Sequence, residues 1–112
     1  AEELAPDDWR RMNPRFQAEN LAANLALVDA VKGIATERGC TPAQLALAWL
    51  LHRSPRVVPI PGTRKIERLE ENAGATALAL SADELAKLEA VLKRQAVAGT
   101  RYPDAGMANV NV

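Results

Sequence analysis

Apolar residues recur along most of the chain at the spacing of a helix. From residue 20 onward, Leu21, Leu25 and Val28 fall on one stripe of a helix with a broad apolar face. Gly39 follows this stripe at the point where a left-handed residue would end the helix. A second apolar run begins directly afterwards, so the pattern predicts helices over most of residues 20–53.

The second helix has the clearest start in the chain. Thr41 can cap it, Pro42 suits the first helical position, and Gln44 completes a capping box. Ser81 and Glu84 have the spacing of a second capping box, at the start of the C-terminal helix. Residues 45–51 are apolar on every side, which predicts a buried helix rather than one on the surface.

A short β-branched run interrupts the helices. Residues 56–61 contain Val57, Val58 and Ile60 and predict a strand, which a turn at Gly62 and a charged helix follow. The complete predicted order is a loop over 1–17, helices over 20–53, the strand over 56–61, a helix over 65–75, a C-terminal helix over 81–97 and an irregular tail over 98–112.

This order contains one strand, and one strand cannot pair its own backbone N–H and C=O groups. A valine-rich strand between a buried helix and a charged helix is typical of the parallel sheet in an α/β barrel or a doubly wound fold. We therefore expect residues 1–112 to be a single partial domain, mostly helical itself, that a larger sheet completes. The alternatives are that the strand pairs with a second copy of the chain, or that the segment is not extended in isolation.

Composition narrows the possible functions. Lys plus Arg and Asp plus Glu each number 14, so the chain carries no net positive charge that would favour binding to nucleic acid or to an anionic membrane. No segment approaches the roughly 20 apolar residues of a membrane helix. The single cysteine, Cys40, excludes an internal disulfide, and with the single histidine, His52, it makes a metal site unexpected. These features favour a cytoplasmic protein.

The segment after the predicted strand combines the features of an anion site. The first turn of a helix has unpaired backbone N–H groups and a partial positive charge, and both stabilise an anion. Three cations surround this helix start: Arg64, Lys65 and Arg68. Arg68, Glu71 and Asn72 are spaced at i, i+3 and i+4, so one helix face could hold both a phosphate and a base.

Several segments, taken in order, resemble the C-terminal third of an aldo-keto reductase, a (β/α)8 TIM barrel that uses NADPH. They are Asp8–Arg11 with Asn13–Phe16, Thr41–Trp49, Val58–Thr63, Glu71-Asn72 and Gly99–Tyr102. In the same order, these segments resemble the loop after the family's seventh strand, its seventh helix, and its eighth strand with the following turn. The last two resemble the end of the family's cofactor signature and the tail of one bacterial and plant branch. The resemblance covers nearly all of the chain.

The resemblance implies an NADPH site after the eighth strand. The residues that would form it are Gly62, Thr63, Arg64, Arg68, Glu71 and Asn72. The first three would line the adenosine 2′-phosphate, Arg68 would pair with it, and the last two would hydrogen-bond the adenine. Family members often carry Lys and Ser where Gly62 and Thr63 stand, so the turn here would depend more on backbone donors and on Arg64.

The same resemblance places Trp9, Arg10, Arg15 and Phe16 on a loop that could shape a pocket for a small carbonyl substrate. An anchoring contact within the protein is an equal alternative for these residues. The family's catalytic Asp, Tyr, Lys and His positions fall outside the segment, so we expect no catalytic residue in this chain. His52, at the end of the buried helix, is expected to be structural.

Two functions stay open on the sequence. The first is the C-terminal, cofactor-binding portion of an NADPH-dependent aldehyde or ketone reductase, with the remainder of the barrel as its partner. The second is a catalytically dead small helical protein that self-associates through its apolar faces and at most binds a nucleotide.

Overall fold

The computed structural model describes residues 4–110, and the chain divides into two compact units. Unit 2 is the continuous stretch of residues 30–91, and unit 1 combines the residues up to 29 with those from 92 onward. The sequence predicts that residues 1–112 are a single partial domain of a larger fold. Because other residues would complete that fold, this stays a prediction.

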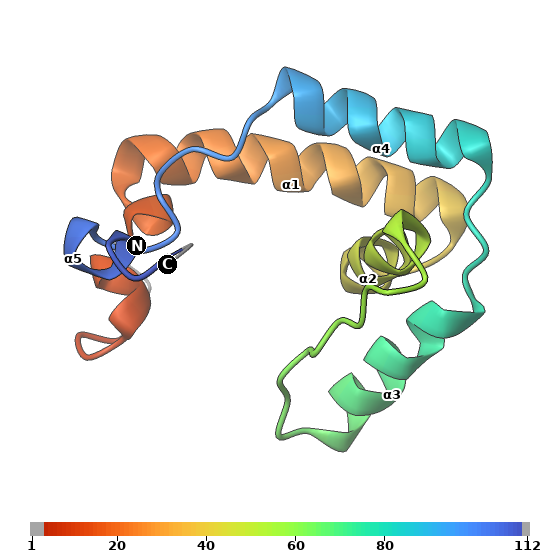
Figure 1. The fold of residues 1–112 in the computed structure, drawn as a ribbon, viewed down its shortest axis with the longest axis horizontal. Coiled ribbons are helices and arrows are strands. Elements are labelled where there is room, and N and C mark those ends of the chain that lie inside the picture. Colours follow the sequence, from red (N-terminus) through yellow and green to blue (C-terminus); the bar gives the residue numbers. More distant parts are fainter. Residues whose placement is uncertain (1–3, 111–112) are drawn as a thin grey trace. The chain divides into compact units, whose positions relative to one another are not determined.

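Helices make up the regular structure of the described residues (Figure 1). The α-helices are α1 (Ala18–Arg38), α2 (Pro42–Arg53), α3 (Ile66–Gly74), α4 (Ala82–Arg94) and α5 (Asp104–Met107). The 3-10 helices are η1 (Trp9–Met12), η2 (Pro14–Phe16) and η3 (Ala75–Ala77). Short helical turns thus occupy parts of the predicted N-terminal loop and of the predicted irregular tail.

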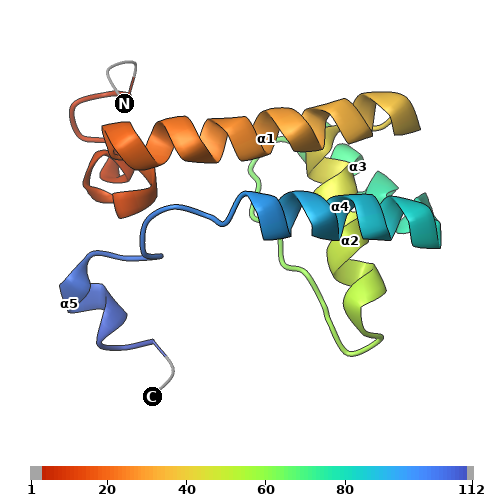
Figure 2. The same cartoon turned by 90° about the horizontal axis from the view of Figure 1, so that it is seen from above.

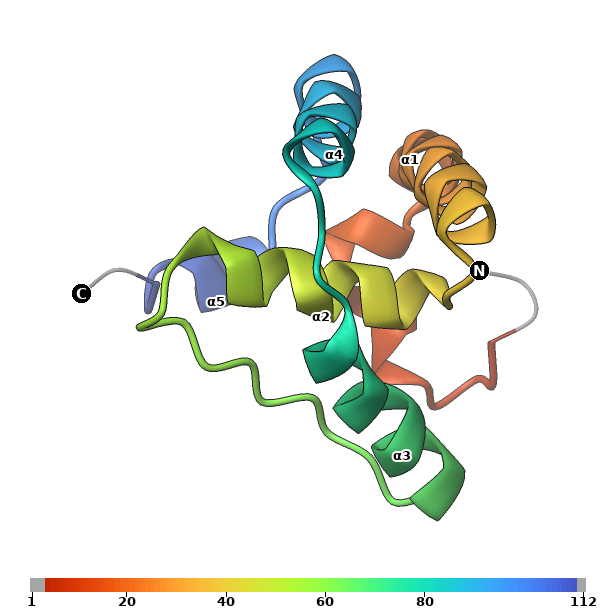
Figure 3. The same cartoon turned by 90° about the vertical axis from the view of Figure 1, so that its right-hand side faces the viewer.

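The strand predicted over residues 56–61 is not observed, because residues 4–110 contain no strand. The segment between α2 and α3 runs as an irregular chain (Figure 3). A strand needs a neighbour for its backbone hydrogen bonds, and Pro59 and Pro61 each lack an N–H donor. Val58 and Ile60 are 78% and 92% exposed, so two of the three apolar side chains that predicted the strand are not covered by the described residues.

The local capping signals form as the sequence predicts. Thr41 Oγ1 accepts the Gln44 N–H at 3.2 Å, and Gln44 Oε1 accepts the Thr41 N–H at 3.1 Å. Ser81 and Glu84 make the same reciprocal pair at the start of α4, at 3.2 and 2.7 Å. Gly39, with φ of 71°, ends α1 in the left-handed conformation that glycine adopts without strain.

The core of unit 2 is small and aliphatic. It consists of Ala35, Leu45, Ala48, Leu80 and Leu88. These residues join α2 to the neighbouring parts of α1 and α4, which lie side by side (Figures 1 and 2). Among the residues of α2, only Leu45 and Ala48 are buried, so the helix predicted to be covered all round has an open side.

His52 ties the end of α2 to the segment before α4. Its Nε2 accepts the Leu80 N–H at 3.3 Å, so the ring proton lies on Nδ1, which donates to the Ala48 carbonyl at 2.8 Å. This is the structural role that the sequence predicts for His52.

Asparagine side chains hold unit 1 together. Asn24 donates to the carbonyls of Arg15 and Ala98, both at 3.0 Å, and accepts the Ala98 N–H at 2.9 Å. Asn13 is 7% exposed and donates to the Arg101 carbonyl at 3.2 Å. Both residues thus bond the start of the unit to its later part.

Gly99 lies against the backbone of Pro14 in the same unit. Its φ is 83°, and a Cβ atom there would lie 2.9 Å from the carbonyl carbon and oxygen of Pro14. Asn20 Nδ2 donates to the same carbonyl at 2.9 Å. Both the backbone conformation and the space therefore require glycine at this position.

Candidate nucleotide-binding site

The helix α3 begins without a side-chain cap. Lys65, its N-cap residue, makes no capping hydrogen bond, so the N–H groups of the first turn receive no cap from that side chain. Thr63 orders the approach, because its Oγ1 accepts the Lys65 N–H at 3.1 Å and donates to the Lys65 carbonyl at 3.3 Å. Glu67 in the first turn suits the helix dipole but disfavours an anion. An anion at this helix start would therefore need nearby cations to stabilise it.

Gly62 does not form the tight turn that the sequence predicts. It lies in the irregular segment before α3, whereas the positive φ angles of the described glycines occur at Gly39 and Gly99. A Cβ atom on Gly62 would meet nothing within 4 Å. Neither the backbone conformation nor the packing of the described chain therefore requires glycine at position 62.

The three cations predicted around the helix start are all exposed. Arg68 Nη1 lies 2.6 Å from Glu71 Oε2, and the two side chains are 64% and 18% exposed. An exposed ion pair of this kind contributes about 0–1 kcal/mol, so Arg68 can exchange its partner for a phosphate at small cost. Arg64 and Lys65 make no ion pair within residues 4–110.

Glu71 is held on both its side chain and its backbone. Hydrogen bonds from the side chains of Thr41 and then Arg68 lower the pKa of the Glu71 carboxyl. Gln44 Nε2 donates to the backbone carbonyl of Glu71 at 3.0 Å. A charged carboxylate in a fixed position is a good acceptor for an N–H group such as the amino group of adenine.

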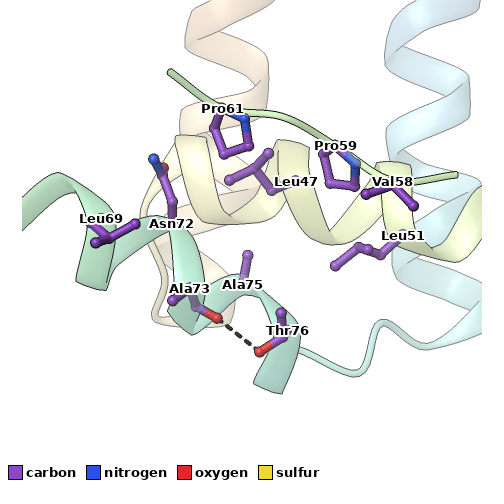
Figure 4. Close-up of a pocket in the computed structure, with 10 residues that line it drawn as sticks. All are labelled: Leu47, Leu51, Val58, Pro59, Pro61, Leu69, Asn72, Ala73, Ala75 and Thr76. Carbon is purple, nitrogen blue, oxygen red and sulfur yellow. Dashed lines mark hydrogen bonds between the residues drawn. The ribbon is translucent and has the colours of Figure 1, made fainter. Parts of the chain in front are cut away.

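Asn72 lines an apolar cavity of about 320 Å³ within unit 2 (Figure 4). Its walls come from α2, the irregular segment and α3 with η3, and include Leu51 and Pro59. Thr76 lines the cavity too, but its hydroxyl donates to the Ala73 carbonyl at 2.8 Å. Asn72 is thus the one residue with an amide side chain among those that line this cavity.

The two arginines of the predicted substrate loop bond within unit 1. Arg10 contacts the Asp8 carboxylate through Nε at 3.0 Å and Nη2 at 2.6 Å, and this lowers the pKa of Asp8 to about 2. Arg15 Nε donates to the Gly99 carbonyl at 3.5 Å, and the Arg15 N–H is bonded by Asn13 Oδ1 at 3.0 Å. These contacts favour the anchoring interpretation of the loop.

The aromatic residues of that loop line different cavities of unit 1. Trp9 borders a cavity of about 170 Å³ with Tyr102, and Phe16 borders one of about 400 Å³ with Leu25 and Val28 of α1. The four predicted loop residues therefore do not meet in one of these pockets. They also belong to a different unit from the predicted cofactor residues, which fall within residues 62–72.

Sequence reasoning missed Thr41 and Gln44 as neighbours of the candidate site. It assigned both to helix capping, which is a local signal, whereas Glu71 follows Gln44 by 27 residues. Nothing in the spacing of the chain could have indicated this contact.

Residues 4–110 contain no group of three or more His, Cys, Asp and Glu residues that could hold a metal ion. None of the helices in that range combines the length and apolar character needed to cross a membrane.

Comparison with known proteins gives a family match. The model of the Aldo/keto reductase family matches residues 2–93. A protein of Schizosaccharomyces pombe, named aldo-keto reductase yakc with NADP(+) as part of the name, is 44% identical over 96 residues. That stretch is 86% of this chain but 28% of the S. pombe protein, so the chain spans about a quarter of that relative's length. No solved structure matches significantly.

Proposed function

Because the chain belongs to the aldo/keto reductase family, we propose that it is the C-terminal, cofactor-binding portion of a cytoplasmic NADPH-dependent reductase. In this proposal the remainder of a (β/α)8 barrel is its partner. The irregular segment before α3, with its exposed Val58 and Ile60, would become the eighth strand when neighbouring strands supply hydrogen-bond partners. The S. pombe relative, whose name includes NADP(+), supports the choice of cofactor.

The observation that carries the proposal is the arrangement of Arg68, Glu71 and Asn72 on α3. Arg68 is exposed and, among the contacts within residues 4–110, is held only by a surface ion pair, so its guanidinium would be available to a phosphate. Glu71 is fixed and charged, and Asn72 lines an apolar cavity. A fork-shaped cation, an anionic acceptor and an amide on one helix match a phosphorylated adenosine in charge and in hydrogen bonding. Gly62, Thr63 and Arg64 would line the same phosphate.

The complete protein would reduce a small aldehyde or ketone to an alcohol. NADPH, when bound, supplies the hydride for this chemistry. The residues of this chain bind and orient the adenosine end, and we assign no catalytic residue to them. The proton donor and its neighbours would come from the remainder of the barrel.

Cofactor titration with an Arg68→Ala variant tests the proposal. Losing charge-assisted hydrogen bonds to the 2′-phosphate should weaken NADPH binding by roughly ten- to a hundredfold, while NADH, which lacks that phosphate, should change less than about threefold. Fluorescence titration measures both affinities, and Arg56→Ala removes an equal charge from another exposed site of unit 2 as a control. Equal losses for both cofactors would refute the phosphate assignment.

A second candidate rests on the exposed apolar side chains of Val58, Ile60 and Ile66. Such residues favour a small protein that associates with a second copy of itself and at most binds a nucleotide. Sedimentation of the purified protein, with its intact mass, separates the two candidates. A stable oligomer of 112-residue chains that shows no carbonyl reduction would support this second function.

A further inference from the structure

The ring of His52 bonds two backbone groups at once. Its Nδ1 lies 2.8 Å from the Ala48 carbonyl oxygen, and its Nε2 lies 3.3 Å from the Leu80 backbone nitrogen. A carbonyl oxygen accepts a hydrogen bond and a backbone N–H donates one, so both bonds form only when Nδ1 carries a proton and Nε2 does not. The neutral ring in this one tautomer is therefore the form that fits.

The Leu80 N–H belongs to the segment 78–81, which connects η3 to α4. Side chains of two other helices bond the backbone of this segment. His52 of α2 accepts the Leu80 N–H, and Arg38 of α1 donates from Nη2 to the Ala79 carbonyl at 3.1 Å. The Leu80 side chain is 8% exposed and belongs to the core of unit 2. Losing the His52 bond would therefore loosen a segment that places a core residue.

Protonation of the ring removes the bond to Leu80 and no other. A protonated Nε2 carries a hydrogen, so it cannot accept the Leu80 N–H. The Nδ1 proton still donates to the Ala48 carbonyl, and a positive charge in the last turn of α2 suits the helix dipole. The side chain is exposed, so water can solvate the charged ring. The protonated ring thus stays on α2 but no longer holds Leu80.

Other charged groups of unit 2 do not compete for this ring. His52 makes no ion pair within residues 4–110, and the segment 78–81 carries no charged side chain. The ion pairs of the neighbouring helices join Arg53 to Glu89 at 2.7 Å, Arg38 to Glu84 at 3.0 Å and Lys87 to Glu37 at 3.4 Å.

The charge of these groups is steady where a histidine titrates. Carboxyl, guanidinium and ammonium groups ordinarily change charge outside the range of about pH 5 to 8, in which a histidine ring changes its own. Bonds to the N–H and hydroxyl of Ser81 lower the pKa of Glu84 below its ordinary value of 4.5. Burial raises the pKa of the Cys40 thiol above its ordinary value of 9.0. A change in this part of the chain between about pH 5 and 8 would therefore report on the ring.

We propose that His52 is a pH-sensitive latch: the neutral ring holds the segment 78–81 to α2, and the protonated ring releases it. The latch does not depend on the proposed function, because no candidate cofactor residue takes part in it. Its effect is local, since the bond of His52 within α2 persists in both charge states.

Hydrogen exchange at the Leu80 N–H tests the latch. Its protection, corrected for the intrinsic exchange rate at each pH, should fall roughly three- to tenfold between about pH 8 and pH 5 as the bond to Nε2 is lost. The Ala98 N–H is the matched internal control, because Asn24 Oδ1, which does not titrate, accepts it at 2.9 Å. Its protection should stay constant over the same range.

The His52→Gln variant removes the titration but keeps an amide oxygen that can accept the Leu80 N–H. Leu80 protection should then be independent of pH. Nuclear magnetic resonance of the ring nitrogens gives a second measurement in the wild-type protein. These signals belong to His52, since the chain contains a single histidine. Nδ1 should carry the proton at about pH 8, and Nε2 should gain one at the same midpoint as the change at Leu80.

Three results would each overturn the latch. The first is a neutral ring whose proton lies on Nε2. The second is a Leu80 protection that does not change while the ring titrates. The third is a fall in Leu80 protection that the His52→Gln variant retains.

Discussion

Asn24 bonds two carbonyls and one N–H group of unit 1 with a single amide. Leucine has a similar size but would leave these partly buried groups unpaired. We expect Asn24→Leu to destabilise unit 1 by roughly 2–3 kcal/mol and to remove protection of the Ala98 N–H. Hydrogen exchange at the Ala98 N–H measures this loss of protection. Asn109→Leu, the same substitution at an exposed position, is the control. Unchanged protection at Ala98 would contradict the role of Asn24.

The start of α4 is the element whose stability should depend on pH. Bonds to the N–H and hydroxyl of Ser81 lower the pKa of Glu84 below its ordinary value of 4.5. The carboxyl of Glu84 therefore binds a proton more readily in the unfolded chain than in the folded one. Its contribution to stability is present above pH 4.5 and is lost as the pH falls below that value.

Glutamine at this position keeps a capping box but does not titrate. We therefore expect Glu84→Gln to abolish the acid-induced loss of protection at the Ser81 N–H, followed by hydrogen exchange between about pH 3 and pH 6. Glu70→Gln, on the exposed part of α3, is the control. A wild-type profile in Glu84→Gln would show that the capping carboxylate is not the titrating group.

Elements with local causes were predictable from the sequence, and elements with distant causes were not. The caps at Thr41, Ser81 and Gly39 depend on residues within a few positions, and all are observed. The strand over 56–61 depends on neighbours that the described chain lacks, and it is absent. In the candidate site, the helical spacing placed Glu71 beside Arg68, but its bonds to α2 had no sequence signal.

For the molecule as a whole, balanced charge and exposed apolar residues should limit solubility. The isoelectric point is about 6.8, and Ile60 is among the most exposed apolar side chains of unit 2. Little charge opposes association near this pH. We expect Ile60→Lys to raise the solubility at neutral pH severalfold, measured by concentration to precipitation. Ala46→Lys, at an exposed position, adds the same charge without removing a large apolar group. An equal gain in solubility for this variant would show that charge alone causes the effect.

The contact of Gly99 with Pro14 has a consequence for the order of events during synthesis. Unit 2 is one continuous stretch, so all of its own residues have been synthesised once residue 91 is in the chain. Unit 1 must wait for residues that follow unit 2, because Asn13 and Asn24 find their carbonyl partners at Arg101 and Ala98. The turns at the start of unit 1 are therefore synthesised before unit 2 but completed only after it.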